Sequence, residues 1–226
     1  VSRFLRGCDG VKFISEETAR GFSPDWSMFA SVNTLDDVER YLAHHGPHGE
    51  AARGAPVLGV LRGWETLLQL LSADQAGYFF PCCAIEDRPR FTWRGLLIDV
   101  GRHFHPVEVI KRNLDAMAAV KMNVLHWHLT EDQGFRVESK VFPKLHQLGS
   151  DGLFYTQDQI RDVVGYAAER GIRIMPEFDV PGHSTSWFVA YPEFASAPGS
   201  YAIERRFGIF GPAFNPADER IYPFFD

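Results

Sequence analysis

The stretch GLLIDVGRHFHPVEVIKRNLDAMAAVKMNVLHWHL, from Gly95 to Leu129, predicts a strand, a helix and a second strand in succession. GLLIDV, residues 95–100, is a short apolar run typical of a parallel strand buried on both faces. Pro106 is favourable as the first residue of a helix. One face of that helix collects apolar residues at spacings of three and four, namely Val107, Ile110, Leu114, Met117 and Ala118.

The same alternation continues along the chain. NVLHWHL, residues 123–129, predicts the second strand, and IRIMPEF, residues 172–178, predicts a third. Between them a helix is expected to open at Thr156, because Gln159 follows at the capping-box spacing, and to stop at Gly171. A β-α-β-α-β order implies parallel strands joined by right-handed crossovers.

Such units build either an open sheet or a closed (β/α)8 barrel. The first strand is followed by GRHFHP and not by a GxGxxG loop, so a dinucleotide-binding sheet is disfavoured. Polar residues instead follow each strand: Asp99, Arg102 and His103; then His126, His128, Glu131 and Asp132; then Glu177, Asp179 and His183. Because barrels place catalytic groups at the carboxyl ends of successive strands, we predict an α/β fold, a TIM barrel. A barrel takes about 250 residues, and about half as many follow Arg94, so a partial barrel with the first three strands is expected.

The region before the barrel divides into two parts. Residues 56–93 are predicted to hold a helix and a loop that lead into the barrel, with Leu61, Trp64, Leu68 and Leu71 on one helix face. Residues 1–55 carry weaker patterns: a short helix in residues 36–45, a solvated histidine group in residues 44–48, and a linker in residues 46–56. The barrel segment itself is residues 94–226.

Composition limits the possible partners. A formal charge of -6, a pI near 5.8 and no cluster of Lys or Arg argue against nucleic acid. No apolar run reaches the ~20 residues that a membrane span needs. The three cysteines are too few for a disulfide framework, and we expect buried thiols. A small, roughly neutral ligand is therefore favoured.

The second strand carries the most informative polar residues. His126 and His128 share one face, while Leu125, Trp127 and Leu129 share the other and should meet the helices. A His-x-His pair at a barrel strand end is also typical of metal-dependent amidohydrolases, although their pair usually comes from the first strand. A third interpretation is that these histidines only structure the strand end.

A sharp turn follows the third strand in EFDVPGHSTSW, residues 177–187. Pro181 and Gly182 would bring His183 back over the strand ends, within reach of Asp132 or Asp179. A histidine paired with a carboxylate can tune a nearby acid near neutral pH. The alternative is a loop histidine that caps a backbone carbonyl.

The pair Asp218 and Glu219 resembles a catalytic carboxylate pair but is better explained by helix initiation. Asn215 is a good N-cap, Pro216 a good first helical residue, and acids in the first turn favour the helix dipole. Arg94 lies directly before the first strand. This position fits either an arginine in a sugar-binding pocket or a solvated arginine on the surface.

Four motifs agree in order and spacing with one family. WRGLLIDVGRHFHP, NVLHWHLTEDQGFRVES, GIRIMPEFDVPGHSTSW and FNPADERIYPFFD resemble the family 20 glycoside hydrolases, the β-N-acetylhexosaminidases, over about residues 54–226. The resemblance implies removal of terminal β-linked N-acetylglucosamine or N-acetylgalactosamine from glycans or chitooligosaccharides, with retention. The substrate's own acetamido oxygen is the nucleophile in this family. No cofactor and no metal are implied, residues 1–55 would belong to a small α/β domain, and family habit favours an extracytoplasmic or lysosome-like setting.

The resemblance also implies roles for single residues. Arg94 is similar to the arginine that grips the sugar hydroxyls. Asp132 and His183 resemble the pair that contacts the substrate region and buffers the general acid, with Asp179 as a supporting acid. His126, His128 and Glu131 resemble the residues behind that pair.

The general acid of the family is a Glu in an Asp-Glu pair after a glycine-rich turn at the end of the fourth strand, whereas Asp218 and Glu219 lie in a different motif and cannot substitute for it. We therefore expect the chain by itself to be inactive. A truncated sequence, a split protein completed by another chain and a non-catalytic sugar-binding remnant all fit this expectation. His105, where the family commonly carries an apolar residue, is a smaller departure.

Overall fold

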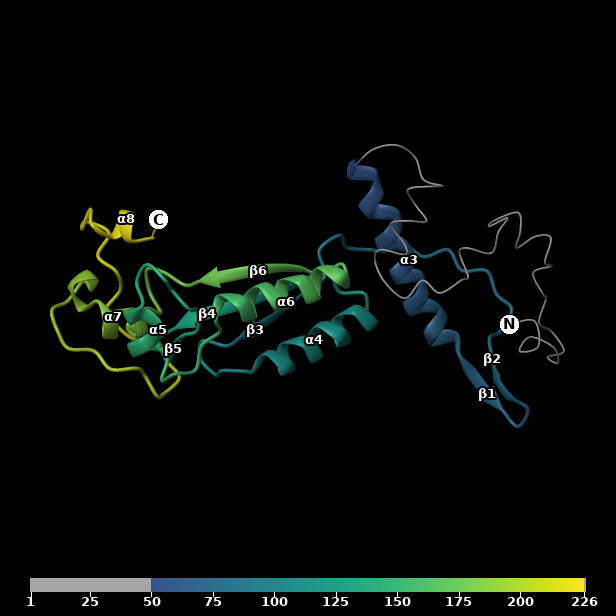
Figure 1. Ribbon diagram of the computed structural model, residues 1–226, viewed down its shortest axis with the longest axis horizontal. Coiled ribbons are helices and arrows are strands. Elements are labelled where there is room, and N and C mark those ends of the chain that lie inside the picture. The colour runs from purple at the N-terminus through teal and green to yellow at the C-terminus, as the bar shows by residue number, and fades with distance from the viewer. Residues whose placement is uncertain (1–49, 226) are drawn as a thin grey trace. The chain divides into compact units, whose positions relative to one another are not determined.

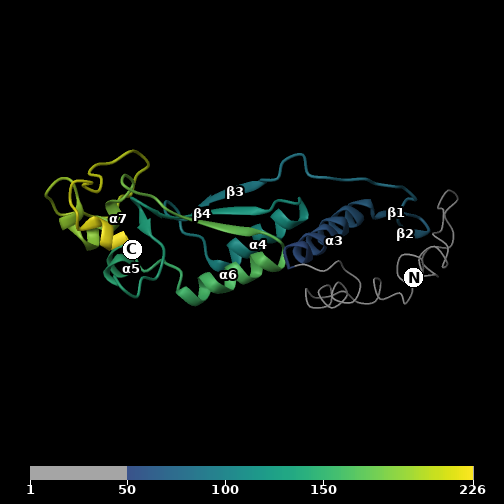
Figure 2. The ribbon, with the colours of Figure 1, turned by 90° about the horizontal axis from the view of Figure 1, so that it is seen from above.

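The computed structural model describes residues 50–225, which Figures 1 and 2 show as coloured ribbons. The chain divides into two compact units, Val1–Thr92 and Trp93–Asp226. Within the described residues, no helix is both long and apolar enough to cross a bilayer. The short helix and the histidine group predicted within residues 36–48 lie outside the described part.

The described part of the first unit is a helix followed by a hairpin. Helix α3 spans Glu50–Leu70, and strands β1 (Ser72–Asp74) and β2 (Gly77–Phe79) pair antiparallel. The predicted helix is confirmed, but the linker predicted for residues 46–56 is wrong from residue 50 onward, because the sequence EAAR at residues 50–53 consists of good helix formers. Cys82 and Cys83 are exposed and not buried as expected.

The second unit is built on a parallel sheet. Strand β4 (Val124–Glu131) lies between β3 (Gly95–Asp99) and β6 (Arg173–Phe178) and is parallel to both. This confirms the three predicted strands and their direction, and in the described residues the sheet is not closed into a barrel. A short strand missed by the sequence, β5 (Gly134–Phe135), turns back antiparallel onto β4.

Two helices cover one face of this sheet, α4 (Val107–Ala119) and α6 (Gln157–Glu169), as Figure 2 shows. Thr156 caps α6 in the predicted capping box: its hydroxyl accepts from the Gln159 amide at 3.1 Å, and the Gln159 side chain accepts from the Thr156 amide at 2.9 Å. Gly171 follows α6 in the left-handed region, with φ 63°. Pro106 is the N-cap of α4, whereas the sequence predicted it as the first helical residue, so the helix starts one residue later than expected.

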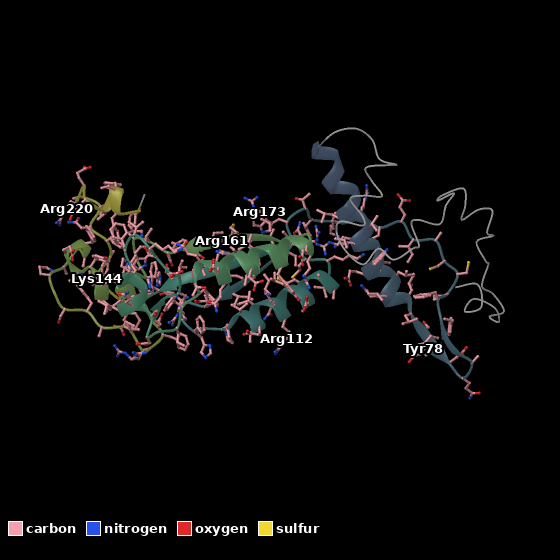
Figure 3. The ribbon with its side chains drawn as sticks, in the orientation of Figure 1. Tyr78, Arg112, Lys144, Arg161, Arg173 and Arg220 are labelled. Carbon is pink, nitrogen blue, oxygen red and sulfur yellow. The ribbon has the colours of Figure 1, made fainter. Side chains whose placement is uncertain are left out.

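The side chains of β4 alternate as predicted. Leu125, Trp127 and Leu129 are buried against the apolar faces of α4 and α6, whose charged residues, such as Arg112 and Arg161, lie on the exposed faces (Figure 3). The expected burial of the first strand on both faces is wrong, since the Leu97 side chain is 51% exposed. In the described residues, the face opposite the helices is covered only partly.

A second, aromatic core lies beyond the carboxyl ends of the strands. It is formed by β5, α5 (Lys144–Gly149), α7 (Thr185–Ala190), the 3-10 turn η1 (Pro192–Phe194) and α8 (Ile221–Phe225). Its buried members include Phe135, Trp187, Phe188, Phe214 and Phe224. This core holds the loops that follow β4 and β6.

The helix predicted to start at Asn215 is wrong in its start, because α8 begins only at Ile221. Side chains bind the intervening backbone in separate turns: Asn215 Oδ1 accepts from the Ala217 amide at 3.2 Å, and Asp218 Oδ1 accepts from the Arg220 amide at 3.0 Å. Such Asx turns compete with helix formation. The explanation of Asp218 and Glu219 as acids in the first turn of a helix is therefore wrong, and Asp218 instead accepts a hydrogen bond within a local turn.

Candidate functional site

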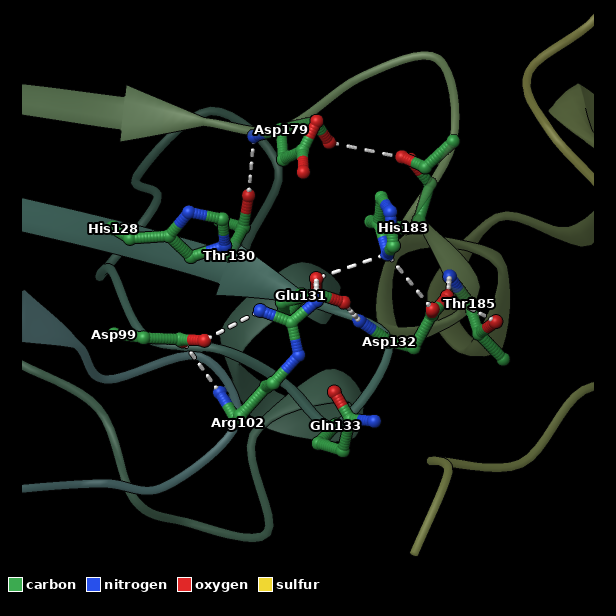
Figure 4. Close-up of polar contacts among 12 residues, drawn as sticks. Asp99, Arg102, His128, Thr130, Glu131, Asp132, Gln133, Asp179, His183 and Thr185 are labelled. Atoms are coloured by element: carbon green, nitrogen blue, oxygen red, sulfur yellow. Dashed lines mark hydrogen bonds and ion pairs between the residues drawn. The ribbon is translucent and has the colours of Figure 1, made fainter. Parts of the chain in front are cut away.

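The candidate site lies where β4 ends. Thr130, Glu131 and Asp132 are fully buried although they are polar. The loop after β3 approaches them with Arg102, and the loop after β6 approaches with Asp179 and His183 (Figure 4). A parallel sheet brings its carboxyl ends to one edge, so three segments distant in sequence meet here.

Asp132 is held by the start of α7. Its Oδ1 accepts from the Thr185 amide at 2.9 Å and from the Thr185 hydroxyl at 2.6 Å. Its Oδ2 is buried without a hydrogen bond and lies 3.4 Å from Nδ1 of His183. One oxygen is thus anchored while the other faces the imidazole.

His183 occupies a tight turn. The Val180–Pro181 peptide bond is cis, and His183 has φ 53°, a left-handed conformation that is uncommon for residues other than glycine. The Ser184 hydroxyl donates to the Gly182 carbonyl at 2.6 Å and holds the turn. Nδ1 of His183 lies 2.9 Å from Oε1 of Glu131, closer than its 3.4 Å from Asp132. The predicted return of His183 over the strand end is therefore present, but the nearer carboxylate is Glu131.

Glu131 is a buried carboxylate surrounded by donors. Its Oε2 accepts from the Asp132 amide at 2.7 Å, and its Oε1 forms an ion pair with Arg102. Arg102 in turn binds Asp99 Oδ2 at 2.6 Å. Burial raises the pKa of the Glu131 carboxyl, and this outweighs the Asp132 hydrogen bond and the charges of Arg102 and His183, which act in the opposite direction.

A glycine allows the loop after β3 to approach Glu131 this closely. A Cβ built at Gly101 would lie 2.7 Å from the Cβ of Glu131 and 2.9 Å from its amide nitrogen. Any other residue would push the loop, and with it Arg102, away from Glu131.

The same loops are tied together by a buried guanidinium. Arg136 donates to backbone carbonyls in three segments, those of Val100, Gly101, Gln133, Ser150 and Leu153. Burial lowers its pKa. Arg136 thus fixes the ends of β3 and β4 relative to each other.

Asp179 lies beside this group. Its amide donates to the Thr130 hydroxyl at 3.0 Å, and its carboxylate has ligand atoms within 4.8 Å of those of His128 and Glu131. The structure therefore brings together Asp132, His183, Asp179 and Glu131, four of the residues that the sequence nominated.

His126 and His128 belong to a different contact. Both lie against Oε2 of Glu177 on β6, at 2.5 Å from His126 Nε2 and 2.7 Å from His128 Nδ1. Burial would raise the pKa of Glu177, but the hydrogen bonds and charges of His128 and His126 outweigh burial and lower it. The sequence placed Glu177 at a strand end without giving it a role. The contact could have been found from the parallel register of β4 and β6, which places Glu177 opposite His128.

This contact also bears on the amidohydrolase hypothesis. Two ligands of one Zn²⁺ lie about 3 Å or more apart, because each is about 2.0–2.2 Å from the ion. The spacings at Glu177 are shorter and correspond to hydrogen bonds. In the described residues, the donor sets with spacing suited to a cation are Glu131, Asp132 and His183, and His128, Glu131 and Asp179, and Arg102 already neutralises the Glu131 that they share.

Arg94 lies away from the candidate site, next to the segment before β4. Its amide donates to Asn123 Oδ1 at 2.9 Å and its Nε donates to the Lys121 carbonyl at 2.7 Å, so it contacts the segment before β4. Asp132 follows the other end of β4, and a strand of eight residues is about 26 Å long. The structure does not bring Arg94 to Asp132, because a residue that precedes a parallel strand lies at the amino edge of the sheet.

An open cavity of about 420 Å³ adjoins the site. The Glu204 amide donates to the Asp132 carbonyl at 3.2 Å, and Gln133 Nε2 donates to the Arg206 carbonyl at 2.7 Å, so the wall of the cavity is bonded to the turn between β4 and β5. The lining residues are Thr185, Ser200, Tyr201, Ala202, Ile203, Glu204, Arg205, Arg206 and Gly211. No sequence pattern indicated this cavity, because its wall is irregular chain.

Comparisons with known proteins agree with the geometry. The model of the catalytic domain of glycosyl hydrolase family 20 matches residues 91–226. A β-hexosaminidase of Porphyromonas gingivalis is 37% identical over 202 residues, which are 82% of this chain and 26% of that protein. A Flavobacterium johnsoniae chitobiase structure is 57% identical with a TM-score of 0.73, and the match covers 75% of this chain and 26% of that one.

A third match is an exo β-N-acetylglucosaminidase of Vibrio harveyi whose structure contains N-acetylglucosamine. It is 36% identical with a TM-score of 0.62, over 74% of this chain and 29% of that one. The chain thus spans between a quarter and a third of the length of these three relatives.

Proposed function

The chain belongs to glycosyl hydrolase family 20, and on this premise we propose that the protein is a β-N-acetylhexosaminidase that releases terminal, non-reducing N-acetylhexosamine from β-linked glycans. Chitooligosaccharides are the proposed substrate class, since one relative is a chitobiase and another binds N-acetylglucosamine. The family assignment also replaces the amidohydrolase hypothesis. The proposal concerns the whole protein, because the chain corresponds to only part of its relatives.

In the proposed reaction, the acetamido oxygen of the substrate attacks the anomeric carbon and the bond to the leaving oxygen breaks as that oxygen takes a proton. Water then opens the oxazolinium ring, and the sugar keeps its β-configuration. A nucleophile inside the substrate has a very high effective concentration once it is oriented. The protein therefore has to orient the sugar and control one proton.

The residues of this chain are suited to the control of the proton. The observation that carries the proposal is the contact between Asp132 and His183, which are 3.4 Å apart at the buried carboxyl end of β4. A carboxylate and an imidazole at this distance can stabilise and buffer a general acid near neutral pH. Asp179, next to them, is proposed as a supporting acid. For Arg94, the proposed grip on the sugar hydroxyls has no support from its position at the amino edge.

The test uses the protein expressed from the complete coding sequence. We expect hydrolysis of 4-nitrophenyl N-acetyl-β-D-glucosaminide or its galacto counterpart, and proton NMR should show the β-anomer as the first product. The matched control is the β-glucoside that lacks the acetamido group, which we expect to react slower by on the order of 10³-fold, because it has no internal nucleophile. Equal rates on both substrates, or an α-anomer as first product, would contradict the proposal.

A further inference from the structure

Most of the wall of the cavity beside Asp132 belongs to a single loop, residues 196–213, which we call the cavity loop. The loop contains no helix and no strand. An antiparallel bridge between the two residues that flank it closes its base, and the Ser196 amide donates to the Ala213 carbonyl at 2.9 Å. The position of the rest of the loop therefore depends on the contacts that its middle makes.

The middle of the cavity loop is fixed to the residues around Asp132. The Glu204 amide donates to the Asp132 carbonyl at 3.2 Å, and Gln133 Nε2 donates to the Arg206 carbonyl at 2.7 Å. Thr185, which also lines the cavity, donates its amide and its hydroxyl to Asp132 Oδ1 (Figure 4). A molecule in the cavity would therefore lie next to the carboxylate on which the proposed function depends.

The charged residues of the lining favour a neutral ligand. Arg205 is paired with Asp151, at 2.5 Å through Nη1 and at 3.0 Å through Nη2. Arg206 and Glu204 carry opposite charges, and Nη2 of Arg206 lies 4.0 Å from Oε2 of Glu204. A charged ligand would gain from one of these two residues and lose to the other.

The polar and aromatic groups of the lining are suited to a sugar ring. In the described residues, the Ser200 hydroxyl makes no hydrogen bond, and the Glu204 carboxylate has only its long contact with Arg206. A carboxylate can accept from two neighbouring hydroxyls, and a guanidinium can donate to two oxygens. Tyr201 adds an aromatic ring, on which the apolar face of a sugar can pack. The cavity volume of about 420 Å³ is within the range of small-molecule sites, about 300–1,000 Å³.

We propose that this cavity binds the neutral sugar that follows the terminal N-acetylhexosamine, and that Glu204 is the residue that determines the preference for it. The proposal rests on the proposed function, since a leaving sugar exists only for a glycosidase. It narrows the substrate class to chains in which the leaving group is itself a sugar, and it assigns the recognition of that sugar to the cavity loop.

The experiment uses the protein from the complete coding sequence and two substrates that differ in the leaving group. These are N,N′-diacetylchitobiose, which leaves a sugar, and 4-nitrophenyl N-acetyl-β-D-glucosaminide, which does not. Glu204→Gln should lower kcat/KM for the disaccharide by about tenfold to a hundredfold, because a charged acceptor of sugar hydroxyls becomes neutral. The aryl substrate should lose less than about threefold, so the ratio of the two kcat/KM values should fall.

Two further variants complete the series. Ser200→Ala should lower the same ratio by about threefold to tenfold, because one neutral hydrogen bond to the sugar is lost. Glu169→Gln on α6, whose side chain is 67% exposed, is the matched control and should leave the ratio unchanged. Circular dichroism and thermal melting check that each variant folds, and Ser200→Ala carries the test if Glu204→Gln does not.

Two results would overturn the proposal while the wild type is active. One is an unchanged ratio in both Glu204→Gln and Ser200→Ala. The other is an equal loss on both substrates, which would mean that Glu204 acts through Asp132 and not on the leaving sugar. If the wild type hydrolyses neither substrate, the proposed function is refuted, and calorimetry with the intact disaccharide then tests the cavity. We expect a Kd that is at least about tenfold weaker in Glu204→Gln, and equal Kd values would contradict the assignment.

Discussion

Two histidine–carboxylate clusters, one within β4 and β6 and one at the carboxyl ends of the strands, differ in how their carboxylates are held. The within-strand cluster consists of His126, His128 and Glu177, and the strand-end cluster consists of Arg102, Glu131, Asp132 and His183. The Glu177 side chain is 32% exposed and the Glu131 side chain is fully buried. The pKa of Glu177 is lowered because its two histidines outweigh burial, and the pKa of Glu131 is raised because burial outweighs its partners.

The difference shows how similar residue types give different chemistry. At Glu177, partial access to water keeps the cost of ionisation small, so two nearby imidazoles suffice to favour the charge. At Glu131 the carboxylate has lost its water, and the Asp132 amide and the charges of Arg102 and His183 oppose the cost of burial without outweighing it. Keeping Glu131 ionised therefore costs more free energy than keeping Glu177 ionised, as expected for a functional site.

We expect substitutions in the two clusters to lower kcat by very different amounts. Asp132→Asn should lower kcat by about 10²–10³-fold in the protein from the complete coding sequence, because the amide cannot supply the negative charge that supports proton transfer. Glu177→Gln should lower kcat by less than about tenfold. Steady-state kinetics on the aryl N-acetylglucosaminide measures both, and equal losses in the two variants would remove the functional distinction between the clusters.

A second prediction concerns the loop that brings Arg102 to Glu131. Gly101→Ala should destabilise the protein by about 2 kcal/mol, because the new Cβ would lie 2.7 Å from the Glu131 Cβ and the loop would have to move. The matched control is Gly165→Ala in α6, where nothing lies within 4 Å, and this change should stabilise by about 0.5–1 kcal/mol. Denaturant unfolding measures both, and a neutral Gly101→Ala would show that the close approach is not required.

The smallest expected effect is a pH dependence of the within-strand cluster. Because the pKa of folded Glu177 is lowered from 4.5, its ionised form stabilises the protein above about pH 4.5. That contribution is lost as the pH falls through the lowered pKa. Glu177→Gln should therefore show a smaller loss of Tm than wild type between about pH 5 and pH 3. Parallel Tm curves for the two proteins would mean that the histidines do not favour the charge on Glu177.

Much of the fold could be predicted from local patterns. The alternation in β4 predicted that Leu125, Trp127 and Leu129 would face the helices, and the Thr156–Gln159 spacing predicted the start of α6. Both depend on the fixed periods of strands and helices, which are visible in a few residues. The start of α8 was missed because the side chains of Asn215 and Asp218 bind nearby amides in place of a helical turn.

The candidate site was predictable as a set of residues but not as a set of contacts. Polar residues after successive parallel strands had to meet at one edge, so the convergence of Asp132, Asp179 and His183 followed from the order of elements. The same argument places Arg94 at the opposite edge, although its motif had suggested a sugar contact. No sequence motif predicted the contacts that Arg102, Thr185 and Glu177 make.

The parallel strands, the helices on one face and the family could all be inferred from the sequence, because backbone periodicity and ordered motifs are local properties. The folded chain was needed to show that His183 lies closer to Glu131 than to Asp132, and that the Glu177 carboxylate contacts both His126 and His128. These contacts join residues far apart in the chain, and for His183 the two carboxylates differ only between 2.9 Å and 3.4 Å in distance. The positive φ at His183 and the close approach of Gly101 to Glu131 are likewise not encoded in the spacing of residues along the chain.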